Sequence, residues 1–228
     1  MLRTDYFGHD RIYRKRRAAG NPGWETAPVT ADTLEALAQE LNAPYLPHTG
    51  RVLEIGCGAG DLSLFLAMRG FEVWGVDVSP FAVGWAREKA KTANLPVRFT
   101  VGDVRDLAGF SDAEFDLVLD GQCLHCIIGD DRTRTLQSVR RVLKPGGVFH
   151  IRTMCGDPTS DALRDGYDPQ TRCIVLGGVA VRYLGAPENI LNEVRAASFE
   201  VIARQVVLTS DQTMLIADAH CLQMGEST

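Results

Sequence analysis

Between residues 51 and 152 the chain alternates short apolar runs with longer amphipathic stretches, and this alternation constrains the fold more than any other feature. The apolar runs have the length of buried strands. Between them, apolar residues at helical spacing or residues typical of helix caps indicate helices. Strands that alternate with helices form a parallel sheet with helices on both faces. We expect strands at 51–55, 71–76, 97–101, 115–119 and 148–152, and helices at 62–69, 79–93 and 131–142.

The rest of the chain frames this alternating core. Residues 1–48 form an N-terminal arm and helix that we expect to act as a lid, and residues 49–228 form one α/β domain. Within that domain, 155–186 is rich in Asp, Gly and Pro and has no clean period, which indicates an insertion above the site. A helix near 187–197 and two strands, 200–208 and 213–222, follow it, and the strands are expected to close the sheet edge as an antiparallel pair.

Composition excludes several classes of protein. The 228 residues are 45% hydrophobic and 23% charged, which is ordinary for a globular domain and not for a disordered chain, a collagen or a coiled coil. The sequence has no run of 18 apolar residues, so no membrane-spanning helix is predicted. The basic first residues lack the apolar core of a secretory signal. A chain of this length builds its own core without disulfides, so we read the six cysteines as reduced thiols of a cytoplasmic protein.

The charge is unevenly spread. Residues 1–20 carry a net charge of +4 within a chain whose net charge is -5. A basic arm can reach for phosphate, carboxylate or nucleic acid, or it can fold back onto the acidic body as a solvated helix. Composition leaves both interpretations open.

A glycine-rich loop follows the first strand in the sequence Glu54-Ile-Gly-Cys-Gly-Ala-Gly60. Glycines between a strand and a helix let the backbone approach a ligand closely, and the helix N-terminus adds donors. The dinucleotide fingerprint needs Gly or Ala in its sixth place, but the two possible frames place Asp61 or Ser63 there. The loop therefore suits a ligand without a pyrophosphate.

Carboxylates follow the neighbouring strands. Asp77 ends the second strand, where it can accept hydrogen bonds from ribose hydroxyls. Asp103 follows the third strand and could meet an adenine amino group, and Asp120 ends the fourth. Because ligands of such sheets bind beyond the carboxyl ends of the strands, these residues are expected at one site.

These segments resemble the ordered motifs of class I S-adenosylmethionine-dependent methyltransferases. The motifs are the glycine loop, Gly75-Val-Asp-Val-Ser79, Gly102-Asp-Val104, Phe115-Asp-Leu-Val-Leu119 and Leu143-Lys-Pro-Gly-Gly147. The resemblance implies a Rossmann-like, mostly parallel seven-stranded sheet whose last strand is antiparallel, with S-adenosylmethionine as cofactor and S-adenosylhomocysteine as product. It implies cofactor contacts from Glu54, Gly56, Cys57, Gly58, Gly60, Asp77, Val78, Asp103, Val104 and Asp120.

The segment Asp120-Gly-Gln-Cys-Leu-His-Cys126 resembles the stretch after the fourth strand of many small-molecule methyltransferases. We expect catalytic roles for His125 and Asp120, with His125 as general base because its ordinary pKa suits neutral pH. The alternative is a histidine that packs locally against backbone. The Cys-x-His-Cys spacing does not fit a structural zinc site, so we expect no metal, although a soft pocket for a thiol or metalloid acceptor stays open.

The remaining acceptor-side candidates come from the arm, the insertion and the fifth strand. Aromatic side chains of the arm could close over the acceptor, and arginines could pair with its carboxylate or phosphate. The expected substrate-binding residues are Tyr6, Tyr13, Trp24, Cys123, His125, Arg152, Arg182 and Tyr183.

The leading hypothesis is therefore methyl transfer to a small-molecule acceptor by in-line displacement. The alternatives are an RNA or protein methyltransferase that uses the basic arm, a thiol or metalloid methyltransferase, and a cofactor-binding regulator without catalysis. The segment after the fourth strand lacks the Asn-Pro-Pro-Tyr type motif of amino-methylating nucleic-acid enzymes, and the body is acidic, so nucleic acid is not the expected partner. We expect a monomer or homodimer that does not contact membranes.

Overall fold

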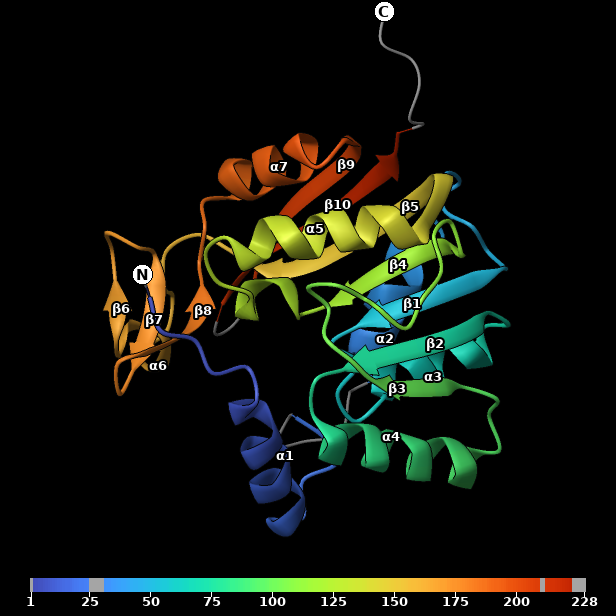
Figure 1. Cartoon of the computed structure of the whole chain (residues 1–228), viewed down its shortest axis with the longest axis horizontal. Coiled ribbons are helices and arrows are strands. Elements are labelled where there is room, and N and C mark those ends of the chain that lie inside the picture. Colours follow the sequence, from blue (N-terminus) through green and yellow to red (C-terminus); the bar gives the residue numbers. More distant parts are fainter. Residues whose placement is uncertain (1, 25–30, 210–211, 223–228) are drawn as a thin grey trace, which may run out of the picture.

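A seven-stranded sheet forms the centre of the molecule, as the computed structural model shows for residues 2–24, 31–209 and 212–222 (Figure 1). The strand order is β3-β2-β1-β4-β5-β10-β9. The strands are β1 (Arg51–Ile55), β2 (Glu72–Asp77), β3 (Arg98–Val101), β4 (Phe115–Gly121), β5 (Leu143–Met154), β9 (Phe199–Leu208) and β10 (Thr213–Cys221). Strands β1 to β5 pair in parallel, whereas β10 runs antiparallel to both of its neighbours, which confirms the expected fold class.

Helices cover both faces of this sheet. They are α1 (Gly8–Ala18), α2 (Ala31–Glu40), α3 (Asp61–Met68), α4 (Pro80–Ala93), α5 (Asp131–Val142) and α7 (Pro187–Ala196), with the 3₁₀ turn η1 (Leu124–Cys126) after β4. In Figure 1, α5 and α7 lie in front of the sheet and α2 and α3 lie behind it. Among the described residues, no helix has the length and apolar character needed to cross a membrane.

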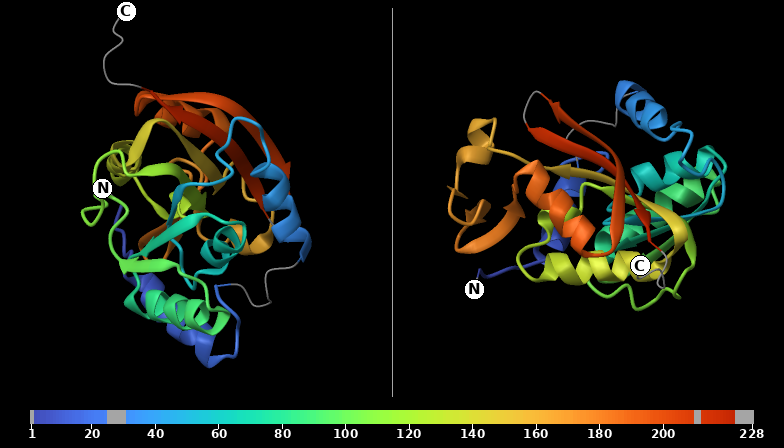
Figure 2. Two further views of the ribbon diagram at one scale, coloured as in Figure 1. Left: turned by 90° about the vertical axis from the view of Figure 1, so that its right-hand side faces the viewer. Right: turned by 90° about the horizontal axis from the view of Figure 1, so that it is seen from above.

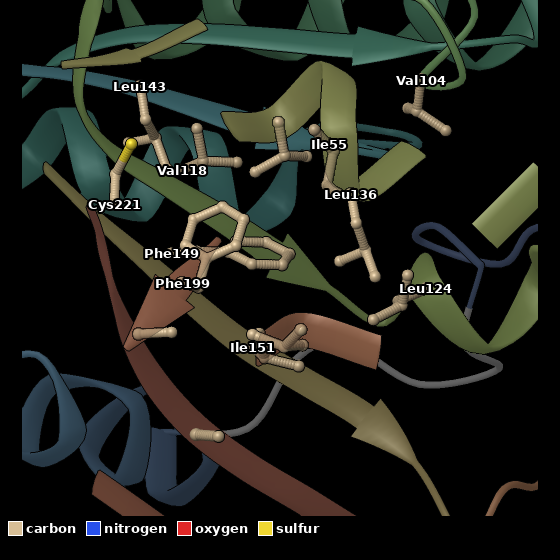
Figure 3. Packing of buried hydrophobic residues seen from close by; sticks show 14 of the residues in the cluster. Ile55, Val104, Val118, Leu124, Leu136, Leu143, Phe149, Ile151, Phe199 and Cys221 are labelled. Carbon is tan, nitrogen blue, oxygen red and sulfur yellow. The ribbon is translucent and has the colours of Figure 1, made fainter. Parts of the chain in front are cut away.

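The alternation of side chains along the strands decides which helices they meet. Ile55 of β1 joins Phe149 and Ile151 of β5 in the large core beneath α5 and α7 (Figure 3). Leu53 of β1 belongs to the same cluster. Val52, one residue out of phase, packs with α2 and α3 on the opposite face. Successive side chains of a strand point to opposite faces, so both layers are built from the same short runs.

The two helices of the expected lid lie in different places. Helix α2 buries Leu37 in the sheet core, and Leu41 directly after the helix is buried there too, so α2 is part of the α/β sandwich. Helix α1 instead packs beside α4, as the left panel of Figure 2 shows. Of these two helices, α1 therefore lies beside the start of α4, whereas α2 carries an apolar face that packs on the sheet.

The insertion at 155–186 contains a second, small sheet. After the short helix α6 (Asp161–Arg164), three strands pair antiparallel in the order β6-β7-β8. They are β6 (Tyr167–Asp168), β7 (Cys173–Leu176) and β8 (Val179–Tyr183). Sequence reasoning expected irregular chain here, because strands this short leave no readable period.

Candidate active site

The glycine loop turns from β1 into α3 at the carboxyl edge of the sheet. Gly56 and Gly58 have φ of 65° and 52°, in the left-handed region that favours glycine. A Cβ at Gly56 would lie 2.5 Å from the Cβ of Cys123, and one at Gly58 would lie 2.1 Å from the hydroxyl of Tyr13. The loop therefore needs glycine here both for its conformation and for close approach.

Asp77 ties this loop to the end of β2. Its Oδ2 accepts a hydrogen bond from the backbone N–H of Gly58 at 2.9 Å, and its Oδ1 accepts one from Ser79 N–H at 2.8 Å. Burial raises the pKa of this carboxyl, and the two backbone donors oppose that shift. The side chain thus holds the loop and also lies where ligands of parallel sheets bind.

Two further carboxyls, Glu54 and Asp120, are buried at this edge. Glu54 accepts a hydrogen bond from the Ser63 hydroxyl, and burial raises its pKa to about 8. Asp120 Oδ1 accepts from the N–H groups of Cys123 and Leu124, whereas its buried Oδ2 has no hydrogen-bond partner in the described part of the chain. Burial raises the pKa of Asp120 to about 7.

These carboxyls make the site suited to a cation. A buried carboxylate without a counter-charge is costly, and a nearby positive charge restores its ionised form. S-adenosylmethionine carries an ammonium and a sulfonium, so the donor set of Glu54, Asp77 and Asp120 fits this cofactor.

The other residues expected to hold the cofactor differ in their burial and in their partners. Burial opposes ionisation of Asp103, but hydrogen bonds from Arg105, including one of 2.6 Å to Oδ2, outweigh it and lower the carboxyl's pKa. Val104 is buried in the core, Val78 is half-buried, and Cys57 is buried beside α4. Burial raises the pKa of the Cys57 thiol, so it serves as a small apolar residue.

His125 lies in η1, directly after β4, and is buried. Its Nδ1 accepts a long hydrogen bond, 3.5 Å, from the backbone N–H of Met154. Burial, followed by the positive charges of Arg182 and Arg132, lowers its pKa well below 6.5. The neutral ring therefore carries its proton on Nε2, an assignment that follows from the Nδ1 contact. This arrangement favours a hydrogen-bond donor over the expected general base.

Cys123 and Cys126 flank His125 and are half-buried. Burial raises the pKa of both thiols, to about 11 for Cys126, so neither is a thiolate at neutral pH. Within residues 2–24, 31–209 and 212–222, no group of three or more His, Cys, Asp or Glu side chains is arranged to hold a metal ion.

Residues 3–18, which we call the strap, pass over this edge of the sheet. Arg3 O accepts a hydrogen bond from Ala180 N–H of β8, at 2.8 Å. Tyr6 donates its hydroxyl to Asp131 at 3.0 Å and accepts from Ile128 N–H at 3.2 Å. The strap thus links the insertion to the segment that follows η1.

The second half of the strap reaches the cofactor side. Asp10 accepts from the Ser79 hydroxyl at 2.8 Å and from Phe81 N–H at 2.9 Å, at the start of α4. Tyr13 is buried against Gly58, and its ring meets Trp24 edge-on with centroids 5.2 Å apart. Sequence reasoning found both aromatic residues but missed Asp10, because nothing in the sequence signals a contact with a helix 70 residues away.

The expected arginines do not lie together. Arg152 approaches Glu40 of α2 at 3.4 Å, on the sheet face where His150 also lies, so it belongs to a different cluster from His125. The alternation along β5 from Val148 through His150 already contained this signal. Tyr183 stacks with Arg132, whose guanidinium carbon is 4.6 Å from the ring centroid, and Arg182 lies beside it on β8.

Fold and site together define the class of protein. A seven-stranded sheet with an antiparallel strand, a glycine loop after β1 and a carboxylate at the end of β2 are the features of a class I S-adenosylmethionine-dependent methyltransferase.

Comparisons with known proteins agree. Residues 52–147 match the family model described as a methyltransferase domain. Over 159 residues the chain is 33% identical to a ubiquinone biosynthesis O-methyltransferase of Xanthomonas axonopodis pv. citri (strain 306). The matched region covers 68% of this chain and 65% of the relative. The chain spans between 42% and 65% of the length of the curated relatives that it matches.

Solved structures extend the likeness over nearly the whole chain. The Burkholderia thailandensis 1,6-didemethyltoxoflavin-N1-methyltransferase, with 1,6-didemethyltoxoflavin and S-adenosylhomocysteine bound, superposes with a TM-score of 0.68 at 25% identity. That superposition covers 95% of this chain and 86% of that one. The PH0226 protein of Pyrococcus horikoshii OT3 gives a TM-score of 0.66 at 27% identity, over 83% and 88% of the two chains. The chain therefore carries a methyltransferase domain of the class I S-adenosylmethionine-dependent type, a domain whose cofactor is S-adenosylmethionine.

Proposed function

We propose that this protein transfers the methyl group of S-adenosylmethionine to a small-molecule acceptor bound between η1, β8 and the strap. The observation that carries the proposal is the course of the strap. It runs from β8, which packs against η1, to the glycine loop, and it is pinned at Ala180, Asp131 and Ser79. An edge covered in this way by the chain itself suits a small acceptor better than a polymer.

Methyl transfer needs little acid–base catalysis. When bound, S-adenosylmethionine would supply a methyl group on a positively charged sulfur for displacement by the acceptor's lone pair, with neutral S-adenosylhomocysteine as the leaving group and any proton of the acceptor released to solvent. Because charge disappears as the methyl leaves, alignment and exclusion of water contribute most of the rate. In this proposal the Nε2–H of His125 orients the acceptor, and Glu54 and Asp120 hold the cationic donor.

The thiol or metalloid alternative has less support. A soft-metal pocket needs thiolates, and the raised pKa values of Cys123 and Cys126 keep both protonated near pH 7. We therefore place oxygen, nitrogen and carbon acceptors ahead of thiol and metalloid acceptors.

Calorimetric titration with S-adenosylmethionine and S-adenosylhomocysteine, followed by a screen of phenols, amines and thiols for methylated product, tests the proposal. Asp77→Ala should weaken binding of both ligands by about 10- to 100-fold, since it removes the carboxyl that accepts hydrogen bonds from the glycine loop and from Ser79. Asp116→Ala is the matched control, because Asp116 also accepts a backbone N–H, that of Arg51, but lies at the opposite end of the sheet. Tight cofactor binding without product from any small acceptor, together with methylation of RNA or protein, would overturn the proposal.

A further inference from the structure

Arg182 stands out among the arginines near the site because it has no partner. In the described part of the chain, no hydrogen bond or ion pair reaches its guanidinium, although the side chain is half-buried on β8. Three neighbouring arginines are engaged. Arg172 pairs with Asp157, Arg132 with Glu193, and Arg105 with Asp103 and Asp131.

The position of β8 directs this charge toward the acceptor side. Strand β8 packs against η1, which carries His125 and Cys126. Arg182 is the largest contributor after burial to the lowered pKa of His125, and it opposes the burial that raises the pKa of Cys126. The guanidinium therefore lies within electrostatic reach of both side chains.

Among the described residues, no carboxylate forms an ion pair or a hydrogen bond with this guanidinium. The acidic side chains on this side, Asp131, Asp157 and Glu193, are already paired with other arginines. His125 is neutral and offers no counter-charge. A half-buried cation without a partner is unfavourable, and the planar guanidinium fork matches a carboxylate or a phosphate in geometry.

We propose that Arg182 binds an oxyanion group of the methyl acceptor, a carboxylate or a phosphate, so that the substrates are small anionic molecules. This inference rests on the proposed small-molecule function and narrows it. The anion would pair with the two parallel N–H groups of the guanidinium, and the Nε2–H of His125 would lie beside the same ligand. The acceptor atom would then face the cofactor over the glycine loop.

Matched probes test this without knowledge of the natural acceptor. The complex with S-adenosylhomocysteine is titrated with benzoate against benzamide, and with phenyl phosphate against benzyl alcohol, by calorimetry or NMR shifts. We expect one anion to bind at least about 10-fold more tightly than its neutral counterpart, as a bidentate charge-assisted pair predicts. The tighter of the two anions identifies the carboxylate or the phosphate as the group recognised.

Arg182→Gln should remove this preference while leaving the binding of benzamide and S-adenosylhomocysteine unchanged. Arg182→Lys should keep part of it, because the charge remains without the fork. The control is Arg204→Gln on β9, an exposed arginine paired with Glu188. Equal binding of anions and neutral probes, no anion binding at all up to about 10 mM, or a preference that survives Arg182→Gln would overturn the inference.

A second arm separates this inference from the proposed function. Hydroxybenzoates and the corresponding hydroxybenzamides are compared as methyl acceptors with wild type and Arg182→Gln. Methylation of the neutral compounds, equally fast in both proteins, would leave the small-molecule function standing and remove the anion requirement. Failure to bind S-adenosylhomocysteine in the first step would count against the proposed function itself.

Discussion

Glu54 and Asp120 hold protons near neutral pH when the site has no ligand. Burial raises the pKa of Glu54 to about 8 and that of Asp120 to about 7. A cationic donor bound beside them favours their ionised forms and lowers both pKa values, so binding releases protons. We expect the affinity for S-adenosylmethionine to rise with pH from about 6 to about 9. Calorimetry in buffers of different ionisation enthalpy counts the protons released.

Glu54→Gln should reduce the number of protons released. It should also weaken the binding of S-adenosylmethionine by about 10-fold, the value of one charge-assisted contact. S-adenosylhomocysteine lacks the sulfonium charge and should show a shallower pH dependence. Glu72→Gln, at an exposed carboxyl that already pairs with Arg98, is the control and should change neither quantity. An affinity that is flat with pH would contradict this assignment.

The same two carboxyls affect folding in the opposite sense. A group whose folded pKa is raised contributes stability that is lost as the pH rises through that pKa. The protein without ligand should therefore unfold more readily at pH 9 than at pH 6, and bound S-adenosylmethionine should reduce the difference. Thermal unfolding with and without the cofactor measures both effects.

Among the elements, α2 is attached to the sheet by a buried polar cluster. His150 Nδ1 lies 2.7 Å from Asp218 Oδ1, and its Nε2 lies 3.4 Å from Glu40 of α2. Burial disfavours the imidazolium, but these two carboxylates outweigh burial and raise the pKa of His150. Its charged form therefore stabilises the fold below the unfolded pKa, and this contribution is lost as the pH rises through the folded pKa.

His150→Gln should destabilise the protein by about 2 kcal/mol at acidic pH, the scale of hydrogen bonds to charged groups, and by less at alkaline pH. Urea unfolding at pH 6 and 9 measures the two costs. As a control, substitution of the exposed His48 by Gln should change the free energy of unfolding little at either pH. A cost that grows as the pH rises would contradict the charged cluster.

Helix α1 depends on Asp10 for its place on α4. Asp10 accepts a hydrogen bond from Phe81 N–H in the first turn of α4, where N–H groups have no partner within the helix. Asp10→Ala should cost about 1 kcal/mol of stability, as the loss of a helix cap does. It should also expose the strap to limited proteolysis.

The matched substitution is Asp161→Ala, at an exposed carboxyl that pairs with Arg164. It should leave the proteolysis rate of the strap unchanged. If Asp10→Ala also left that rate unchanged, the contact with α4 would not hold the strap.

At the scale of the whole molecule, the basic arm is engaged with the chain's own acidic and aromatic groups. Arg11 pairs with Asp5, Arg14 with Asp10 and Arg17 with Glu88, and Arg17 lies over the Trp85 ring at 5.2 Å. Of the two interpretations left open by charge alone, the structure favours a helix folded onto the acidic body. Three of the six basic side chains of the arm are thus paired with carboxylates of the same chain.

We therefore expect no RNA binding at physiological salt. Fluorescence anisotropy with a labelled single-stranded RNA should show only weak, non-specific association at low salt. A steep salt dependence that disappears when residues 2–20 are deleted would instead support the RNA alternative.

The sequence allowed the main sheet to be predicted but only part of the site. Strand and helix periods are local, so β1 to β5, α5 and the antiparallel β10 could be read from short windows. The strap joins Tyr6 to Asp131 and Asp10 to Ser79, contacts across 125 and 69 residues that leave no local pattern. The proton position on His125 depends on Met154 N–H, which only the folded strand brings near. Residue types thus pointed to the glycine loop, whereas the surroundings of His125, Arg152 and Arg182 follow only from the fold.

The strap is one continuous segment that touches the glycine loop through Tyr13 and β8 through Arg3. A ligand that enters either half must therefore meet the same segment, and its departure must loosen the same contacts. This predicts a compulsory order of binding and release, in which product exchange is limited by the opening of the strap and not by methyl transfer. In steady-state terms, the turnover number would follow the strength of the Asp10 contact with α4, and variants that weaken it would turn over faster while retaining substrate less well.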